Sequence, residues 1–287
     1  MNALELYDDY ISDWFVTRYS KPTPPQAQGW PAISRGEHVL IFAPTGSGKT
    51  LSAFLWGIQS IYRNLASPEP IPGVQLLYIS PLKALNNDIE RNLREPLHGI
   101  QAAAAARGLE LPRLRTAVRT GDTTSSAKQQ QVKRPPQILI TTPESLYLIL
   151  TSPNASEMLA HVRTVIVDEI HTLNGNKRGV HLGISLERLV ERAGEFQRIG
   201  LSATQRPLDE VARYLGGQHW VGDQLIPRPV TIIDPGMKKE LDLQVVTPVP
   251  DLRRLPGKTI WPSLTPMLLE EVRKHRSTLI YTNSRRG

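Results

Sequence analysis

The 287-residue sequence contains no cysteine. Disulfides and thiolate metal sites are therefore excluded, and the chain suits a reducing compartment such as the cytoplasm. No apolar run approaches the ~18–20 residues that a membrane-spanning helix needs, so we expect no membrane partner. Residues 1–5 lack a basic start followed by an apolar stretch, which argues against a signal peptide.

Aromatic residues are also scarce, at 6% of the chain, which argues against broad surfaces for base stacking. Acidic residues are outnumbered: 34 Lys and Arg stand against 27 Asp and Glu, a net charge of +7. This balance suits nucleic acid, although many basic proteins bind none. The length allows one large or two small domains, and the hydrophobic content of 40% is typical of an ordinary folded chain.

Short apolar runs along the first 200 residues predict the strands of a parallel sheet. They are rich in β-branched residues and mostly continuous, which is typical of strands buried on both faces. The runs are 39–43, 75–80, 115–119, 138–141, 165–167 and 199–201, and the expected helices are 3–19, 26–34, 49–65 and 180–192. Strands that alternate with helices predict an α/β domain with right-handed crossovers.

The character of the chain changes near residue 216, where glycine and proline become frequent. Residues 241–246 alternate like a strand, 263–275 predict a helix, and 278–281 predict a buried strand. A buried strand so close to the last residue has no helix to cover it, so we expect the chain to stop inside a second domain. The expected regions are N-terminal helices over 1–35, a first α/β domain over 36–235 and the beginning of a second domain over 236–287.

The strongest motif is a phosphate loop, Ala43-Pro44-Thr45-Gly46-Ser47-Gly48-Lys49-Thr50, between a predicted strand and a predicted helix. Small residues let such a loop curl so that its N–H groups face phosphate oxygens, and the helix N-terminus adds partial positive charge. We expect Lys49 at the β- and γ-phosphates of ATP and the Thr50 hydroxyl on Mg²⁺. The usual first glycine is replaced by Ala43. The expected ATP-binding residues of the loop are Thr45, Gly46, Ser47, Gly48, Lys49 and Thr50.

A carboxylate partner for Mg²⁺ is expected in Val165-Ile166-Val167-Asp168-Glu169-Ile170-His171. Asp168 follows a buried strand and can face the ion, and Glu169 can orient or deprotonate the attacking water. We therefore expect Lys49, Asp168 and Glu169 to be catalytic, with Thr50 and Asp168 as the metal ligands. His171 can couple the nucleotide state to the next segment, or be a packed core histidine.

The order of the motifs resembles that of DExH-box helicases in the second helicase superfamily. Thr23-Pro24-Pro25-Gln26 resembles the adenine-reading Q motif, which implies that Gln26 binds the nucleotide. Residues 80–85, 119–122 and 141–146 resemble motifs that contact nucleic acid, 201–204 resembles motif III, and 278–286 resembles motif IV. The resemblance implies a RecA-like P-loop NTPase domain, with a parallel sheet flanked by helices, and the start of a second RecA-like domain.

Longer stretches, 80–93, 167–171 and 201–207, are similar to the large helicase-related (Lhr) family of bacteria and archaea. The similarity implies an ATP-dependent 3′-to-5′ translocase that loads on single-stranded DNA and unwinds DNA or RNA:DNA duplexes, with the C-terminal remainder of the same polypeptide as partner. The implied nucleic-acid contacts are Lys83, Arg119, Thr120, Gly121, Thr142 and Pro143, and the implied coupling residues are His171, Ser202 and Thr204. Most of the contacts follow predicted strands, which places them at the carboxyl edge of the sheet, the usual ligand face.

Two alternatives share part of this pattern. A P-loop kinase or metabolic NTPase has the same phosphate loop, but the Asp-Glu-x-His element and the following Ser-Ala-Thr argue against it. A scaffold that uses ATP only as a conformational ligand is the non-enzyme alternative. We also expect slow ATP turnover by this chain alone, because the segments that would bring arginine fingers, motifs V and VI, are absent from it.

Overall fold

The computed structural model describes residues 3–203, 207–237, 242–250 and 259–281. It divides into two compact units, Met1–Lys238 and Lys239–Gly287. No helix in this described part of the chain combines the length and the apolar character that crossing a bilayer requires.

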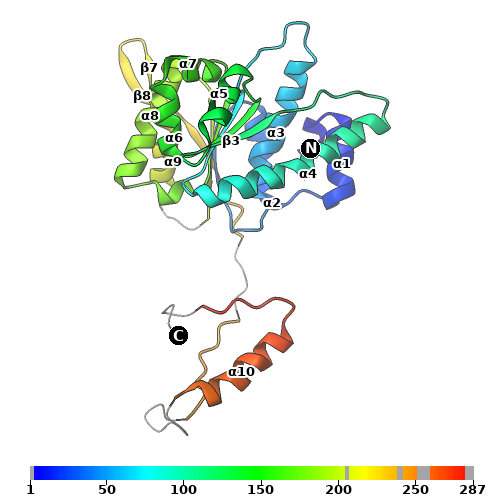
Figure 1. Cartoon of the computed structure of the whole chain (residues 1–287), viewed down its shortest axis with the longest axis vertical. Helices are drawn as coiled ribbons and strands as arrows, with labels where there is room; N and C mark the ends of the chain where they lie inside the picture. The colour runs from blue at the N-terminus through cyan, green and yellow to red at the C-terminus, as the bar shows by residue number, and fades with distance from the viewer. Residues whose placement is uncertain (1–2, 204–206, 238–241, 251–258, 282–287) are drawn as a thin grey trace. The chain divides into compact units, whose positions relative to one another are not determined.

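The first unit is built on a sheet of seven parallel strands (Figure 1). In chain order they are β1 (His38–Phe42), β2 (Leu76–Ile79), β3 (Thr116–Arg119), β4 (Ile138–Thr141), β5 (Thr164–Val167), β6 (Gln197–Ser202) and β9 (Val230–Ile233). Across the sheet the order is β3-β4-β2-β5-β6-β1-β9. The six expected runs are confirmed as strands, whereas β9 and the antiparallel hairpin of β7 (Gln218–Val221) and β8 (Gln224–Pro227) were not predicted.

Side chains of each central strand alternate between two separate cores, because successive residues of a strand point to opposite faces. Leu76 and Tyr78 of β2 belong to one core, and Leu77 and Ile79 to the other. The first core is closed by α1 (Asp9–Tyr19), α2 (Pro24–Ser34), α3 (Lys49–Leu65) and α4 (Lys83–Ala106). The second is closed mainly by α6 (Pro143–Leu150), α7 (Pro153–Ser156), α8 (Lys177–Ala193) and α9 (Leu208–Gly216). The prediction of a parallel sheet covered on both faces is therefore confirmed.

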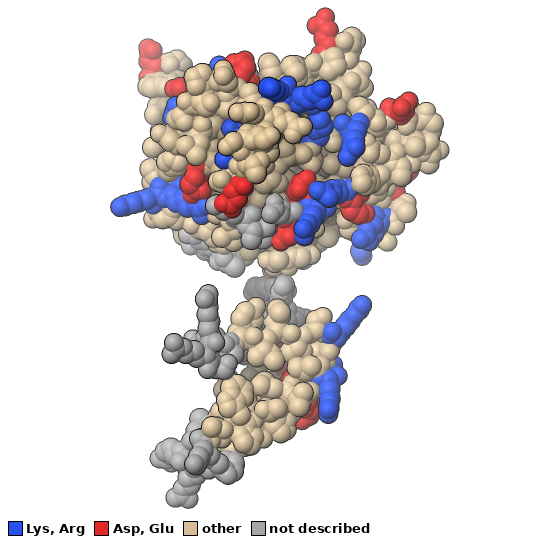
Figure 2. Space-filling view, viewed as in Figure 1, with Lys and Arg blue, Asp and Glu red and all other residues tan. Residues whose placement is uncertain are grey.

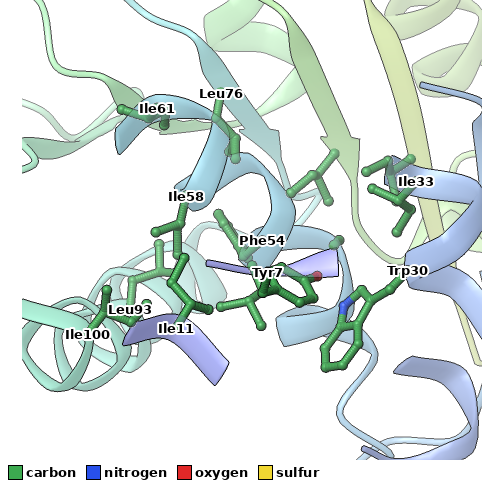
Figure 3. Close-up of a cluster of buried hydrophobic side chains, with 14 of the residues drawn as sticks. Tyr7, Ile11, Trp30, Ile33, Phe54, Ile58, Ile61, Leu76, Leu93 and Ile100 are labelled. Carbon is green, nitrogen blue, oxygen red and sulfur yellow. The ribbon is translucent and has the colours of Figure 1, made fainter. Parts of the chain in front are cut away.

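The N-terminal helices pack directly into the first core (Figure 3). Trp30 and Ile33 of α2 belong to the same buried cluster as Phe54 and Ile58 of α3. The single helix expected over 3–19 is wrong, because a 3-10 turn, Ala3–Leu6, is separated from α1. The interruption is stabilised by α3: the Gln59 amide accepts from the Asp8 backbone at 2.6 Å and donates to the Leu6 carbonyl at 3.2 Å.

The second unit contains α10 (Trp261–Lys274), which confirms the helix expected over 263–275. The strands expected over 241–246 and 278–281 are wrong for the described residues, 242–246 and 278–281, which have no regular structure. A strand needs a neighbour to satisfy its backbone, and no described segment pairs with either one. Leu243 and Leu279 accordingly remain 85% and 80% exposed. Leu241 and the remaining residues of the motif IV resemblance, 282–286, lie outside the described residues.

Candidate active site

The phosphate loop joins β1 to α3, as the motif requires. Gly46 and Gly48 adopt left-handed backbone angles, φ 85° and 82°, and α3 begins at Lys49. Lys49 is only 6% exposed. Its Nζ lies 3.5 Å from the Ala43 carbonyl and 3.7 Å from Oε1 of Glu169. A buried ammonium with such distant partners retains hydrogen-bonding capacity for an anion entering the loop.

Gln26 is brought against this loop from α2. Its Nε2 donates to the Gly48 carbonyl at 3.4 Å, and its Oε1 accepts from the Thr23 backbone at 2.9 Å. A β-carbon on residue 48 would lie 2.8 Å from the Gln26 Nε2. Glycine at position 48 is therefore required both by its backbone angle and by the approach of the glutamine.

Asp168 directly follows β5 and is 5% exposed. Its Oδ2 accepts from the Tyr78 hydroxyl of β2, and its Oδ1 accepts from the Glu169 backbone at 2.8 Å. Burial raises the pKa of Asp168, while these hydrogen bonds and the Lys49 charge act in the opposite direction. The carboxylate is thus held in one orientation, in a place where a cation would be attracted strongly.

Glu169 connects the phosphate loop to the end of β6. It has a left-handed backbone, φ 46°, which is uncommon outside glycine. One carboxylate oxygen faces Lys49, and the other lies 3.4 Å from Nε2 of His171. The other ring nitrogen of His171, Nδ1, is 3.4 Å from the Ser202 hydroxyl. The structure therefore connects His171 and Ser202 to the Glu169 carboxylate, whereas Thr204 lies outside the described residues.

A pocket of about 440 Å³ gathers most of these groups. Its lining includes Lys49, Thr50, Asp168 and Glu169, together with Thr45, Gly46 and Gly48. Ser47 instead turns its hydroxyl into the protein, where it has no hydrogen-bond partner among the described residues. The opposite wall comes from Tyr19 and the α4 residues Ile89, Asn92, Leu93 and Pro96. This wall was not predicted from the sequence, because helical periodicity does not show which loop a helix will face.

The donor set fits a magnesium ion that arrives with a nucleotide. Among the described residues, no group of three or more His, Cys, Asp or Glu side chains could hold a metal alone. Mg²⁺ bound to phosphates needs only one or two protein oxygens, since phosphates and water supply the rest. Thr50 and Asp168 line the same pocket and supply that number.

The residues expected to contact nucleic acid lie on three neighbouring loops. β3, β4 and β2 are adjacent, and the loops that follow them carry Gly121, Pro143 and the start of α4 at Lys83. The Lys83 side chain is outside the described part of the structure. The phosphate loop and Asp168 follow β1 and β5, farther along the same edge.

Three of these side chains are used within the fold. Thr142 caps α6, because its hydroxyl accepts from the Ser145 backbone at 3.3 Å. The Thr120 hydroxyl accepts from the Asp122 backbone at 3.3 Å, and Arg119 donates to the Lys128 carbonyl at 3.2 Å. Burial lowers the pKa of Arg119. Roles for these residues in binding nucleic acid stay predictions.

Comparison with known proteins identifies relatives over nearly the whole chain. The family model for DEAD/DEAH box helicases matches residues 23–211. The Lhr helicase/probable uracil glycosylase of Mycolicibacterium smegmatis is 50% identical over 277 residues, which are 96% of this chain and 18% of that protein. The ATP-dependent helicase Lhr-Core of Methanocaldococcus jannaschii is 48% identical over 281 residues, covering 98% of this chain and 32% of that protein.

A solved structure gives the same result in three dimensions. Mycobacterium smegmatis helicase Lhr bound to ssDNA and AMP-PNP matches with a TM-score of 0.86 and 47% identity, over 100% of this chain and 35% of that one. The chain therefore has the RecA-like fold and spans about a fifth to a third of the length of these relatives.

Proposed function

Because the chain belongs to the Lhr family of DEAD/DEAH box helicases, we propose that it is the ATP-binding part of a nucleic-acid-dependent ATPase that unwinds duplexes. One observation carries the proposal: the Lys49 ammonium lies 3.7 Å from the Glu169 carboxylate, in a pocket that also contains Asp168 and Thr50. A phosphate cation, a metal ligand pair and a carboxylate for water are the parts that phosphoryl transfer needs.

In this proposal each side chain has one task. Lys49 stabilises charge on the β- and γ-phosphates. Thr50 and Asp168 would hold Mg²⁺, which would supply further neutralisation of the phosphates. Glu169 orients the attacking water and accepts its proton. Gln26 reads the nucleotide through its position beside Gly48.

Coupling to nucleic acid runs from Glu169 through His171 to Ser202. The contacts at 3.4 Å that connect these three residues support this role. A shift of Glu169 on hydrolysis would reach the end of β6 through one imidazole ring. The nucleic acid would then lie along the loops after β2, β3 and β4, as expected for Lys83, Arg119, Thr120, Gly121, Thr142 and Pro143.

The direction of movement and the kind of duplex are inferred from the family alone. We propose 3′-to-5′ movement on single-stranded DNA and unwinding of DNA or RNA:DNA duplexes by the whole polypeptide. The present chain should bind ATP with Mg²⁺ but hydrolyse it slowly, because an arginine finger supplied by a complete second domain is worth about 10³–10⁵ in rate.

The test is steady-state ATP hydrolysis by residues 1–287 and by a polypeptide extended through the whole second domain. Each is measured alone and with single-stranded DNA, single-stranded RNA or an RNA:DNA hybrid. Nucleic acid should stimulate the longer polypeptide strongly and the short chain little. If nucleic acid does not change the ATP turnover of either polypeptide, the result would favour a metabolic NTPase. If the longer polypeptide binds ATP tightly but does not hydrolyse it, the result would favour a scaffold.

A further inference from the structure

Outside the candidate active site, a second cavity runs along the free edge of the sheet. It has a volume of about 790 Å³ and lies between α4 and α5 (Ser125–Lys133), with the edge strand β3 as its floor. We call it the edge groove, and its charged lining is Glu90, Arg94, His98, Arg113, Arg115 and Arg134. Figure 2 shows basic side chains gathered on the face where Figure 1 places β3 and α5.

The charges of the edge groove are mostly uncompensated. Its one carboxylate, Glu90, pairs with Arg94 at 3.2 Å. The side chains of Arg113, Arg115 and Arg134 are exposed and make no ion pair or hydrogen bond with any residue that the structure describes. Four arginines therefore face one acid, and three of them are available to an anion from solution.

Local geometry explains why these arginines point outward. Residues 113–115 directly precede β3, and their exposure alternates as it does along a strand. Leu114 is 6% exposed and belongs to the first core, whereas Arg113 and Arg115 on either side of it are exposed. Arg134 directly follows α5 as its C-cap, and Arg94 lies on α4. The cations thus come from three separate segments and border the same cavity.

The lining also indicates what kind of anion fits. Among the described residues it has no Phe, Tyr or Trp, and the His98 imidazole is the one ring of the described lining, so the groove is not a stacking platform for successive bases. Addition of a peptide strand to β3 is disfavoured, because the outward carbonyl of Val118 already accepts from Gln131 at 3.0 Å and from Thr123 at 3.3 Å. A nucleic-acid duplex fits such a lining. Its bases are already stacked and paired with one another, and it presents evenly spaced phosphates to the protein.

The edge groove and one of the loops expected to contact a single strand share the strand β3. The groove is lined by Thr116 and Ala117 at the start of β3, and the strand ends at Arg119, just before Thr120 and Gly121. Lys128 of α5 reaches back to the Gly121 carbonyl at 3.5 Å. We propose that the edge groove binds the phosphate backbone of the duplex from which the single strand emerges, an inference that rests on the proposed function.

The proposal is tested with the triple variant Arg113→Ala/Arg115→Ala/Arg134→Ala and two probes. One probe is a single strand of about ten nucleotides, within the span of one single-strand site. The other carries the same strand as a tail on a duplex. The matched control is Arg35→Ala/Arg63→Ala/Arg163→Ala, which removes the same charge near the amino ends of strands or the end of α3.

For the tailed duplex, we expect the triple variant to bind roughly tenfold or more weakly than wild type. The slope of log affinity against log salt should fall by about 0.9 for each phosphate that the variant no longer neutralises. Affinity for the short strand should change less than about twofold, and the control variant should match wild type on both probes. Arginine-to-lysine replacements at the same three positions should restore most of the duplex affinity, because charge is kept.

Three results would overturn the proposal. Unchanged duplex affinity and slope in the triple variant would mean that the groove binds no nucleic acid. Equal losses on both probes would mean a general effect of charge on the single-strand site. Loss of binding to a polyglutamate peptide with unchanged duplex binding would assign the groove to an acidic protein. A wild-type chain that binds neither probe would contradict the proposed function itself, which separates the two failures.

Discussion

At the carboxyl edge of the sheet, the buried Lys49 has one carboxylate oxygen at 3.7 Å and one carbonyl at 3.5 Å. At the amino edge, the Arg228 side chain is 3% exposed and makes five hydrogen bonds, to Glu187, Glu195 and the Gly216 carbonyl, at 2.8–3.2 Å. Both cations lie in the same domain at similar burial. Arg228 is fully hydrogen-bonded by the protein, whereas Lys49 keeps hydrogen-bonding capacity.

The residue beside Arg228 is also bound by groups of the protein. Arg198, beside Arg228, donates from Nη1 to Glu187 and to the carbonyls of Leu215 and Gly216. Its Nε and Nη2 have no hydrogen-bond partner among the described residues, but its guanidinium lies 5.2 Å from the Phe196 ring centroid, a cation–π contact. Removing one member of such a paired, buried cluster is costly, whereas a buried cation with only distant partners keeps hydrogen-bonding capacity.

Arg228→Ala should show the largest effect, on stability. The substitution removes five hydrogen bonds, leaves Glu195 without its cation and leaves Glu187 paired with Arg198 alone. Because both carboxylates are partly exposed, we expect a loss of about 1.5–3 kcal/mol of unfolding free energy, the value of a hydrogen bond to a charged group. Urea unfolding measures it, with Arg192→Ala as control, because Arg192 pairs with Glu157 at the surface and such pairs contribute under about 1 kcal/mol. Equal small losses in both variants would contradict the structural role of Arg228.

Lys49→Ala should have its effect on function and not on stability. We expect a loss of about 10²- to 10³-fold in ATP turnover by the polypeptide extended through the second domain, because one preorganised charge at the phosphates is removed. The unfolding free energy should stay within about 1 kcal/mol of wild type.

Glu169→Gln sharpens this result. The variant should bind ATP as wild type does and fail to hydrolyse it, because only the base is lost. Nucleotide affinity is measured by titration of the chain itself. Wild-type affinity and turnover in Lys49→Ala would show that Lys49 is not the phosphate lysine.

Tyr78→Phe should have an intermediate effect. The change removes the hydroxyl that donates to Asp168 and keeps the ring stacked on Phe54 at 5.1 Å. A hydrogen bond to a charged group is worth about 1.5–3 kcal/mol, so we expect turnover to fall roughly tenfold and to require more Mg²⁺.

Tyr62→Phe is the matched control, because the buried Tyr62 hydroxyl has no hydrogen-bond partner among the described residues. Its turnover and its Mg²⁺ dependence should match wild type. Identical Mg²⁺ dependence in Tyr78→Phe, Tyr62→Phe and wild type would mean that Tyr78 does not position Asp168.

The smallest effect is expected from protonation of His38, at the amino edge of the sheet, on the free energy of unfolding. Burial, with help from the Arg198 and Arg228 charges, lowers the pKa of His38 to about 4. The unfolded chain binds a proton at its usual pKa of about 6.5, so stability falls as pH drops from about 6.5 toward 4. With a discount for the partial exposure of His38, the loss at pH 5 is about 1–2 kcal/mol.

Urea unfolding at pH 7.5 and pH 5 measures this loss. His38→Gln should show a weaker dependence on pH than wild type, whereas replacement of the exposed His161 by Gln should leave the dependence unchanged. A His38→Gln variant with the full dependence of wild type would assign it to other groups.

Local patterns in the sequence were enough to predict the strands that form the centre of the sheet and the loops that follow them. Continuous β-branched runs are typical of strands buried on both faces, and their alternation with predicted helices indicated an α/β architecture with a covered parallel sheet. Gly46 and Gly48 predicted the phosphate loop, because only a residue without a β-carbon adopts such backbone angles without strain.

The strands predicted over 241–246 and 278–281 were wrong for their described residues, because local pattern alone does not make a strand. Their alternation or apolar character is local, but a strand also needs a partner. β9 was missed because Val230–Ile233 follows a stretch rich in glycine and proline, yet it pairs with β1 along four residues. Pairing of segments that lie far apart in the chain cannot be read from either segment alone.

The sequence by itself determined which chemical groups this protein has: a phosphate loop with Lys49 and Thr50, an Asp-Glu pair after a buried strand, and arginines distributed along the chain. Only the tertiary structure decided which of them act together. It placed Tyr78 on Asp168, His171 between Glu169 and Ser202, and three free arginines around one groove. The physical reason is that residue type and local periodicity determine what a segment can form, whereas contacts between distant segments depend on how the two cores close around the sheet.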